Sequence, residues 1–138
     1  MRRLNPPFIQ PPFAAYSHGV EVPPGRRLVF CSGQLGIDRE GRVAADCEGQ
    51  AEQCFANIAA ILAEAGLTLA DIVRINAYVT GREHLAPYMA VRDRLFPAPF
   101  PASTLMIVAG FARPEFVVEI EAVAAGPVEA GVQPVREA

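Results

Sequence analysis

The sequence feature that most restricts the fold is a stretch near the end, Phe96–Gly126, with the sequence FPAPFPASTLMIVAGFARPEFVVEIEAVAAG. It opens with a proline-rich turn, and two apolar runs follow, Ser103–Ala109 and Phe116–Ala124. The break between them, Gly110–Glu115, is short and contains glycine and proline. Because two apolar runs joined by a turn-forming segment are typical of a β-hairpin, the sequence predicts that these two strands pair with each other.

The second apolar run alternates in character, as expected of a strand with two different faces. One face carries Glu119 and Glu121, two residues apart, with a valine on either side of the pair. Two interpretations of this face stay open. It is either a solvated acidic surface or a partly dry groove, in which desolvation raises the pKa of Glu119 and suits it to proton transfer. The first face holds Val118, Ile120, Ala122 and Ala124, and the second holds Val117, Glu119, Glu121 and Val123.

Two helices are predicted upstream of this stretch. The longer one follows Asp46, a good N-cap, and ends at Gly66, because glycine suits the left-handed position after a helix. A second helix is predicted over Glu83–Leu95, with Pro87 in its first turn, where the missing N–H is tolerated. The longer helix is supported by apolar residues at 3.6-residue spacing: Cys47, Ala51, Cys54, Phe55, Ile58, Ile61, Leu62 and Ala65.

Three further strands are predicted, over Tyr16–Val22, Arg27–Leu35 and Ile72–Val79. Residues 1–14 are rich in proline and are expected to form an irregular arm. Residues 127–138 lack apolar periodicity and are expected to be a frayed tail. The chain is therefore predicted to form a single domain over residues 1–138.

The order of these elements predicts an α+β domain, a mixed β-sheet with two helices packed on one face. Two predicted strands, Arg27–Leu35 and Ser103–Ala109, are nevertheless apolar on both faces. The sheet face that the helices leave uncovered must therefore meet something, and self-association is the natural candidate.

Composition argues against several classes of partner. The net charge of −3 and the pI of about 5.4 disfavour a surface that follows a phosphate backbone, so no nucleic acid is expected. The two histidines, His18 and His84, form no metal motif, and no glycine-rich phosphate loop is present, so neither metal nor cofactor is expected. Three cysteines without a CxxC motif, and no apolar run long enough to span a bilayer, predict a cytoplasmic protein with reduced thiols.

Three motifs give the chain its family resemblance: LVFCSGQLGID, AGLTLADIVRINAYV, and FPAST followed by VVEIEAVA. In this order and at this spacing they resemble the Rid family, also called the YjgF or L-PSP proteins or reactive intermediate deaminases. The resemblance runs from about Tyr16 to Ala124. It implies a chorismate-mutase-like fold, a homotrimer, and small-molecule clefts between neighbouring subunits.

The resemblance also implies a site. Tyr16 matches a tyrosine and Ser32 a serine that line the cleft, and Glu119 matches the glutamate that orients the water hydrolysing an imine. An arginine that pairs with the substrate carboxylate in that family is replaced by Ser103, so the chain resembles the subgroups lacking this arginine. The other positions predicted to line the cleft are Thr104, Leu105, where deaminating members often have cysteine, and Met89, where many have asparagine.

Three functions remain open on these grounds. The first is an enamine or imine deaminase whose specificity is altered by the loss of the arginine, with keto compounds and ammonia as products. The second is a trimer that binds a small molecule in the same cleft without deaminating it. The third is an L-PSP endoribonuclease, which the acidic composition disfavours.

Overall fold

Local sequence signals set both ends of the long helix. In the computed structural model, which describes residues 1–127, helix α1 runs over Cys47–Glu64. The Asp46 carboxylate accepts a hydrogen bond from the Gly49 N–H at 2.8 Å, as an N-cap does. Gly66 has a φ of 71°, the left-handed conformation that ends many helices. Both predicted helix ends are confirmed.

The second helix begins slightly later than predicted. A 3₁₀ turn, η2, occupies Arg82–His84, and helix α2 then runs over Leu85–Leu95. Pro87 lies in the first turn of α2, where its missing N–H breaks no helical hydrogen bond. A further 3₁₀ turn, η1 (Leu69–Asp71), follows α1 and leads into the sheet.

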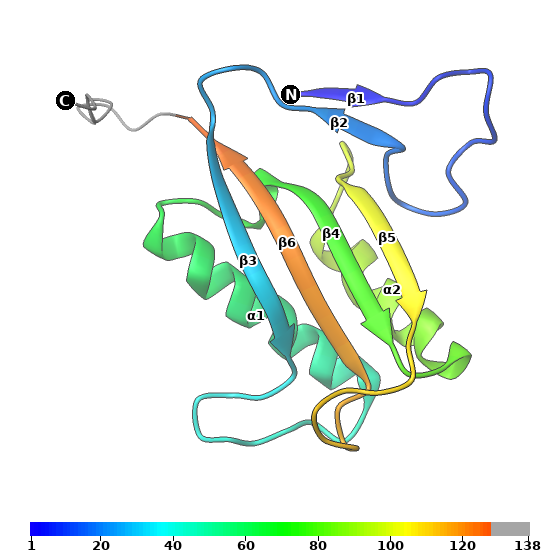
Figure 1. Cartoon of the computed structure of the whole chain (residues 1–138), viewed down its shortest axis with the longest axis vertical. Coiled ribbons are helices and arrows are strands. Elements are labelled where there is room, and N and C mark those ends of the chain that lie inside the picture. Colours follow the sequence, from blue (N-terminus) through cyan, green and yellow to red (C-terminus); the bar gives the residue numbers. More distant parts are fainter. Residues whose placement is uncertain (128–138) are drawn as a thin grey trace.

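Four strands form one mixed sheet in the order β3-β6-β4-β5 (Figure 1). Strand β6 pairs antiparallel with both β3 and β4, and β5 lies parallel to β4 at the edge. The bounds are β3 Arg27–Leu35, β4 Ile72–Val79, β5 Ala102–Ile107 and β6 Val118–Gly126. The predicted extents of β3 and β4 and the mixed character of the sheet are confirmed.

The predicted hairpin is wrong, because β5 and β6 are not neighbours in the sheet. Strand β4 lies between them, and the connection after β5 crosses it. The physical reason lies in the preceding unit: β4, α2 and β5 form a strand–helix–strand crossover, which places β5 parallel to β4 and on its outer side. The inner side of β4 is then left for β6.

The N-terminal segment is more regular than predicted. Arg2–Leu4 forms strand β1, which pairs antiparallel with β2, Gly19–Glu21, in a separate two-stranded sheet. The predicted first strand, Tyr16–Val22, is therefore shortened to β2, and Ser17 makes an isolated bridge to Ala102. The tail was predicted to fray over residues 127–138. Residues 128–138 of this tail lie outside the part of the chain that the structure describes.

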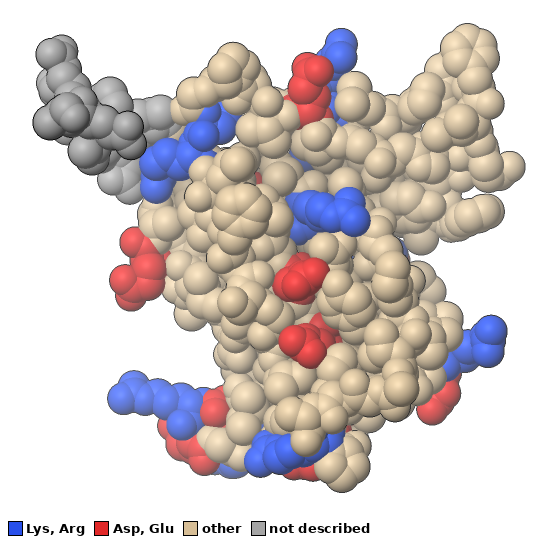
Figure 2. Space-filling model, viewed as in Figure 1, with Lys and Arg blue, Asp and Glu red and all other residues tan. Residues whose placement is uncertain are grey.

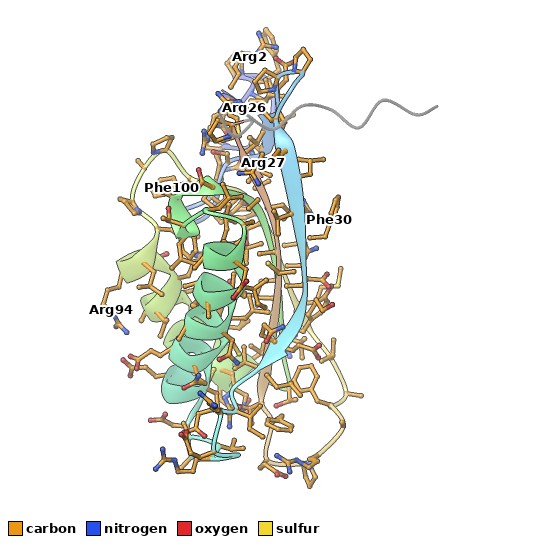
Figure 3. The ribbon with its side chains drawn as sticks, turned by 90° about the vertical axis from the view of Figure 1, so that its left-hand side faces the viewer. Arg2, Arg26, Arg27, Phe30, Arg94 and Phe100 are labelled. Atoms are coloured by element: carbon orange, nitrogen blue, oxygen red, sulfur yellow. The ribbon has the colours of Figure 1, made fainter. Side chains whose placement is uncertain are left out.

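Both helices cover the same face of the four-stranded sheet, as predicted. Figure 3 shows the helices on one side of the sheet and Phe30 projecting from the other. We call this second side the open face. Large apolar side chains on this face remain exposed on the outer strands: Leu28 and Phe30 of β3, and Met106 of β5. Among residues 1–127, no helix has the length and apolarity needed to cross a membrane.

The core lies between the sheet and α1. Residues of α1 at helical spacing, Cys54, Phe55, Ile58 and Leu62, pack against the inward residues of β3 and β6. On β6 these inward residues are Val118, Ile120, Ala122 and Ala124, which confirms the predicted face. The alternate residues of the same strand, including both glutamates, are therefore presented on the open face.

Candidate active site

The open face carries two rows of polar residues across its middle strands. Strand pairing places Asn76 of β4 opposite Glu121 of β6, and Tyr78 opposite Glu119. Directly opposed residues on an antiparallel pair point to the same side of the sheet. The period-two alternation of both strands thus brings two carboxylates, an amide and a phenol together.

Glu121 is held by two donors. The Tyr78 hydroxyl donates to Glu121 Oε1 at 2.8 Å, and the Asn76 side-chain amide donates to the same oxygen at 3.0 Å. Tyr78 lies opposite Glu119 but reaches diagonally to Glu121, a separation that a long side chain spans. The hydrogen bond to Glu121 is also the main reason why the pKa of Tyr78 is raised.

Glu119 differs from Glu121, because its carboxylate accepts no hydrogen bond from the residues that the structure describes. Burial raises the pKa of Glu119, and the neighbouring Glu121 raises it further. Of the two interpretations of this face, the structure therefore supports the partly dry groove. A carboxylate whose pKa is shifted towards neutrality is suited to accept and return a proton.

The β3 strand leaves room for Glu119 at a bulge. Pairing between β3 and β6 shifts register between Cys31 and Gln34, so Ser32 and Gly33 fall outside the regular ladder. A Cβ atom at Gly33 would overlap the Glu119 carboxyl group. Glycine is therefore required at this position for the carboxylate to lie against the strand.

A groove of about 300 Å³ on the open face is lined by Glu121, whereas Glu119 is not among its lining residues. Figure 2, drawn from the side of the open face, shows a basic patch and two acidic patches over the middle of the sheet. On these strands Arg74 of β4 and the two glutamates of β6 have the register that points to this side. The groove is lined by Phe30, Cys31, Ser32, Asn76, Glu121, Ala122 and Val123.

The basic residue of this face, Arg74, donates to a neutral partner. Its guanidinium bonds the Thr104 hydroxyl at 3.0 Å across the β4–β5 pair, and it makes no ion pair with a carboxylate of the described chain. Arg113, which could have reached the site from the turn before β6, is instead paired with Glu115 at 3.0 Å and stacked over Phe116. Among the described residues of β4, β5 and β6, Arg74 is thus the arginine whose register points to the open face.

Ser103 faces the opposite side of the sheet from Glu119. It lies opposite Ile75, a fully buried core residue, and its hydroxyl oxygen is buried without a hydrogen bond. The buried Tyr88 of α2 lies near the Ser103 side chain. Burial is the main cause that raises the pKa of Tyr88, and the neighbouring Ser103 lowers this pKa. Leu105 and Met89 are also partly buried against the core on this side.

The seven predicted site residues therefore occupy three places within one subunit. Glu119, Ser32 and Thr104 lie on the open face, although Thr104 is at the β5 side and Ser32 at the β3 side. Ser103, Leu105 and Met89 lie on the helix side. Tyr16 lies in the segment before β2, where its hydroxyl accepts a hydrogen bond from the Phe13 N–H at 3.3 Å and its ring meets His18 edge-on.

Three residues of this site were missed in the sequence. Asn76, Tyr78 and Gly33 all contact or closely approach the glutamates. The alternation over Ile72–Val79 places Arg74, Asn76 and Tyr78 on one strand face, and this pattern was a usable signal. Which strand lies beside β4 could not be inferred from it, so the partner carboxylate could not be named.

The thiols and metal-ligating groups offer no competing centre in residues 1–127. All three cysteines are free and buried. Burial raises the pKa of Cys47 to about 11 and that of Cys54 to about 12, so neither forms a thiolate readily. No three side chains of histidine, cysteine, aspartate or glutamate cluster as metal ligands within that range.

Comparison with known proteins gives one consistent result. The family model described as Endoribonuclease L-PSP matches residues 9–126. A 2-iminobutanoate/2-iminopropanoate deaminase of Salmonella typhimurium is 34% identical over 113 residues, which cover 79% of this chain and 85% of that protein. A RutC family protein of Aquifex aeolicus is 40% identical over 81 residues, covering 58% of this chain and 62% of the relative, so this match spans less than two thirds of its length.

Among solved structures, a protein of the conserved Rid family, YyfB from Yersinia pestis, superposes with a TM-score of 0.78 at 33% identity. The match covers 89% of this chain and 96% of that one.

Proposed function

The chain belongs to the Rid family of L-PSP proteins, and from this premise we propose that it hydrolyses a reactive enamine or imine to a carbonyl compound and ammonia. The observation that carries the proposal is Glu119, a partly buried carboxylate with a raised pKa and no hydrogen-bond donor of its own. A carboxylate in this state has a free lone pair to offer to a water molecule. Relatives of 27–34% identity that are named as 2-iminobutanoate/2-iminopropanoate deaminases support the reaction type.

The proposed reaction needs one proton shuttle. Glu119 accepts a proton from water as the water oxygen attacks the imine carbon, and the imine nitrogen takes up a proton from solvent. When the tetrahedral intermediate collapses, the carbon–nitrogen bond breaks, the hydroxyl proton passes back to solvent, and Glu119 returns its proton to the leaving nitrogen. Imine and water are consumed, and a carbonyl compound and ammonia are formed, without a metal or cofactor.

We propose altered substrate specificity because no arginine is present at the position of Ser103. A substrate carboxylate that enters a partly dry cleft without a charge partner loses a few kcal/mol of binding, about two orders of magnitude in affinity. The Ser103 hydroxyl is itself buried against the helix layer. A substrate that carries its acidic group elsewhere, or none, would avoid this loss.

We further propose that the cleft is completed by a second subunit of a chorismate-mutase-like homotrimer. Glu119 lies on the open face, whereas Ser103 and Leu105 lie on the helix side, so one subunit does not enclose them in one cavity. The open face also exposes Phe30, 73% accessible, together with Leu28 on the same strand. Apolar exposure of this kind is relieved by association with another copy of the sheet.

The test is ammonia release from a freshly generated short-chain 2-imino acid, and in parallel from an imine without a carboxylate. We expect the purified protein to exceed spontaneous hydrolysis, and Glu119→Gln to lose the excess by a factor of about 10² or more. Glu64→Gln, an exposed change at the end of α1, serves as the matched control and should leave the rate unchanged. Unchanged turnover in Glu119→Gln would refute the role given to this carboxylate.

A second function is favoured by one specific observation. Ser103 stands where the family's substrate-binding arginine would be, and this favours a trimer that binds a small molecule without deaminating it, because no guanidinium is present there to hold a substrate carboxylate. Absence of excess ammonia from both imines, combined with retained association of the chain, would select this function. The endoribonuclease name of the family model is not carried over, because an RNA phosphate approaching the middle of the open face would meet the carboxylates of Glu119 and Glu121.

A further inference from the structure

We propose that Tyr78 and Asn76 are positioning residues, which act through Glu121 to set the proton affinity of Glu119. Tyr78 and Asn76 do so by holding the negative charge of Glu121 at a fixed place beside Glu119. The inference rests on the proposed role of Glu119 in proton transfer and names the residues that tune it. Its starting point is that both donors reach the same atom, Glu121 Oε1, at 2.8 and 3.0 Å.

The geometry restricts where Glu121 can place its charge. A glutamate on a strand face normally has several rotamers that turn its carboxylate into solvent. Here Asn76 directly opposite and Tyr78 diagonally opposite both donate from β4, which draws the carboxylate across the β6–β4 pair. Tyr78 is the residue opposite Glu119. Because its hydroxyl binds the Glu121 carboxylate, that carboxylate is held on the side nearer to Glu119.

This fixed charge acts on Glu119 over a short distance. Residues two apart on a strand are separated by about 6.6 Å, well within the screening length of physiological salt. Burial is the larger cause of the raised Glu119 pKa, and Glu121 is the second. A free Glu121 side chain would turn towards water and weaken this second contribution.

The other titratable groups around Glu119 do not explain the effect. On β4, Arg74 lies two rows away and donates to Thr104. From the helix layer, Cys54 senses the charge of Glu119, but its own pKa is raised to about 12, so it stays neutral. In the segment before β6, Arg113 is already paired with Glu115. Strand β3 contributes no charged side chain at the bulge.

Tyr78 is well suited to a test, because phenylalanine removes its hydroxyl and keeps the ring. The Glu119 pKa is measured from the side-chain carboxyl carbon by NMR on the full-length protein, in the wild type, Tyr78→Phe, Asn76→Ala and Glu121→Gln. We expect Glu121→Gln to lower the Glu119 pKa, because the second cause of its rise is removed while burial, the larger cause, remains. Tyr78→Phe and Asn76→Ala should each lower it by a smaller amount in the same direction.

The decisive comparison is the double variant Tyr78→Phe with Glu121→Gln. If Tyr78 acts through Glu121, the Glu119 pKa in the double variant equals that in Glu121→Gln alone, because the charge that Tyr78 positions is already gone. Tyr88→Phe, which removes a hydroxyl on the helix side of the sheet, should leave the Glu119 pKa unchanged. A Tyr78→Phe effect that persists in the Glu121→Gln background, or no effect in the single variants, would overturn the proposal.

Catalysis provides a second, separate readout. In each variant with measurable ammonia release, the acidic limb of the rate profile should lie at lower pH than in the wild type, by the same amount as the Glu119 pKa falls. An NMR result as expected, without ammonia release from any variant, would refute the proposed hydrolysis and retain the positioning network. A rate profile that does not follow the NMR value would refute the link between the network and proton transfer.

Discussion

The start of β6, and with it the position of Glu119, depends on one buried polar side chain, Gln50 of α1. Its amide nitrogen donates to the carbonyls of Ala44 at 2.9 Å and Glu115 at 2.8 Å, and its oxygen accepts from the Val117 N–H at 3.0 Å. Gln50 is completely buried. Because every polar group of this side chain is satisfied, it ties the long helix to the segment that leads into β6.

We predict that Gln50→Leu lowers the free energy of unfolding by about 2–3 kcal/mol. The part-buried Val117 N–H loses its acceptor, at a cost of about 1–3 kcal/mol, and two carbonyls in partly exposed segments lose a donor at about 1 kcal/mol each. The greater apolarity of leucine offsets about 1–2 kcal/mol of this loss. With a urea m-value of about 1–3 kcal/mol/M, the midpoint should fall by about 1–2 M.

The measurement is urea unfolding at one fixed protein concentration, because association with another copy would make stability depend on concentration. Gln53→Leu is the matched control on the same helix. Gln53 donates only to Asn57, at 2.8 Å near the surface, and its loss should change stability by no more than about 0.5 kcal/mol. If Gln50→Leu also stays within that range at an unchanged m-value, the three hydrogen bonds do not stabilise the start of β6 as argued.

Three further predictions concern the two faces of the sheet. Gly33→Ala should displace the flexible Glu119 carboxyl group towards solvent, so the Glu119 pKa, followed by NMR, should fall towards the ordinary glutamate value. The free energy of unfolding should fall by less than about 1 kcal/mol. An unchanged Glu119 pKa would contradict the close approach of Gly33 and Glu119. Cys47 and Cys54 should react with a thiol reagent at pH 8 at least about 10²-fold more slowly than in urea, and equal rates would refute their burial. Phe30→Asp should shift the protein to a smaller species in analytical ultracentrifugation; an unchanged mass would show that the open face is not the contact between copies.

The pH dependence of stability follows from Glu119. Because its pKa is raised in the folded state, the protonated form is favoured by folding, and stability is lost as the pH rises through the folded pKa. This loss begins at the ordinary glutamate value and ends just above the raised one. Glu119→Gln should therefore lose less stability than the wild type over that pH interval in thermal unfolding. An identical pH dependence in both proteins would show that Glu119 is not desolvated.

The sequence by itself determined the features that depend on near neighbours in the chain. Asp46 and Gly66 marked the ends of α1, because capping hydrogen bonds and a left-handed glycine involve only residues within one turn. Alternation over β6 separated its core face from its acidic face, since successive side chains on a strand point to opposite sides. The same alternation singled out Glu119 as a candidate for proton transfer, and the family resemblance implied that it orients the attacking water.

Only the tertiary structure decided which strands and side chains meet. Two apolar runs with a turn between them predicted a hairpin, but the crossover through α2 placed β4 between β5 and β6. That order gives Glu121 the two donors of β4, and it turns Ser103 towards the helix layer, away from Glu119. Strand order depends on how distant segments bury their apolar faces together, and no periodicity within a single strand contains this information.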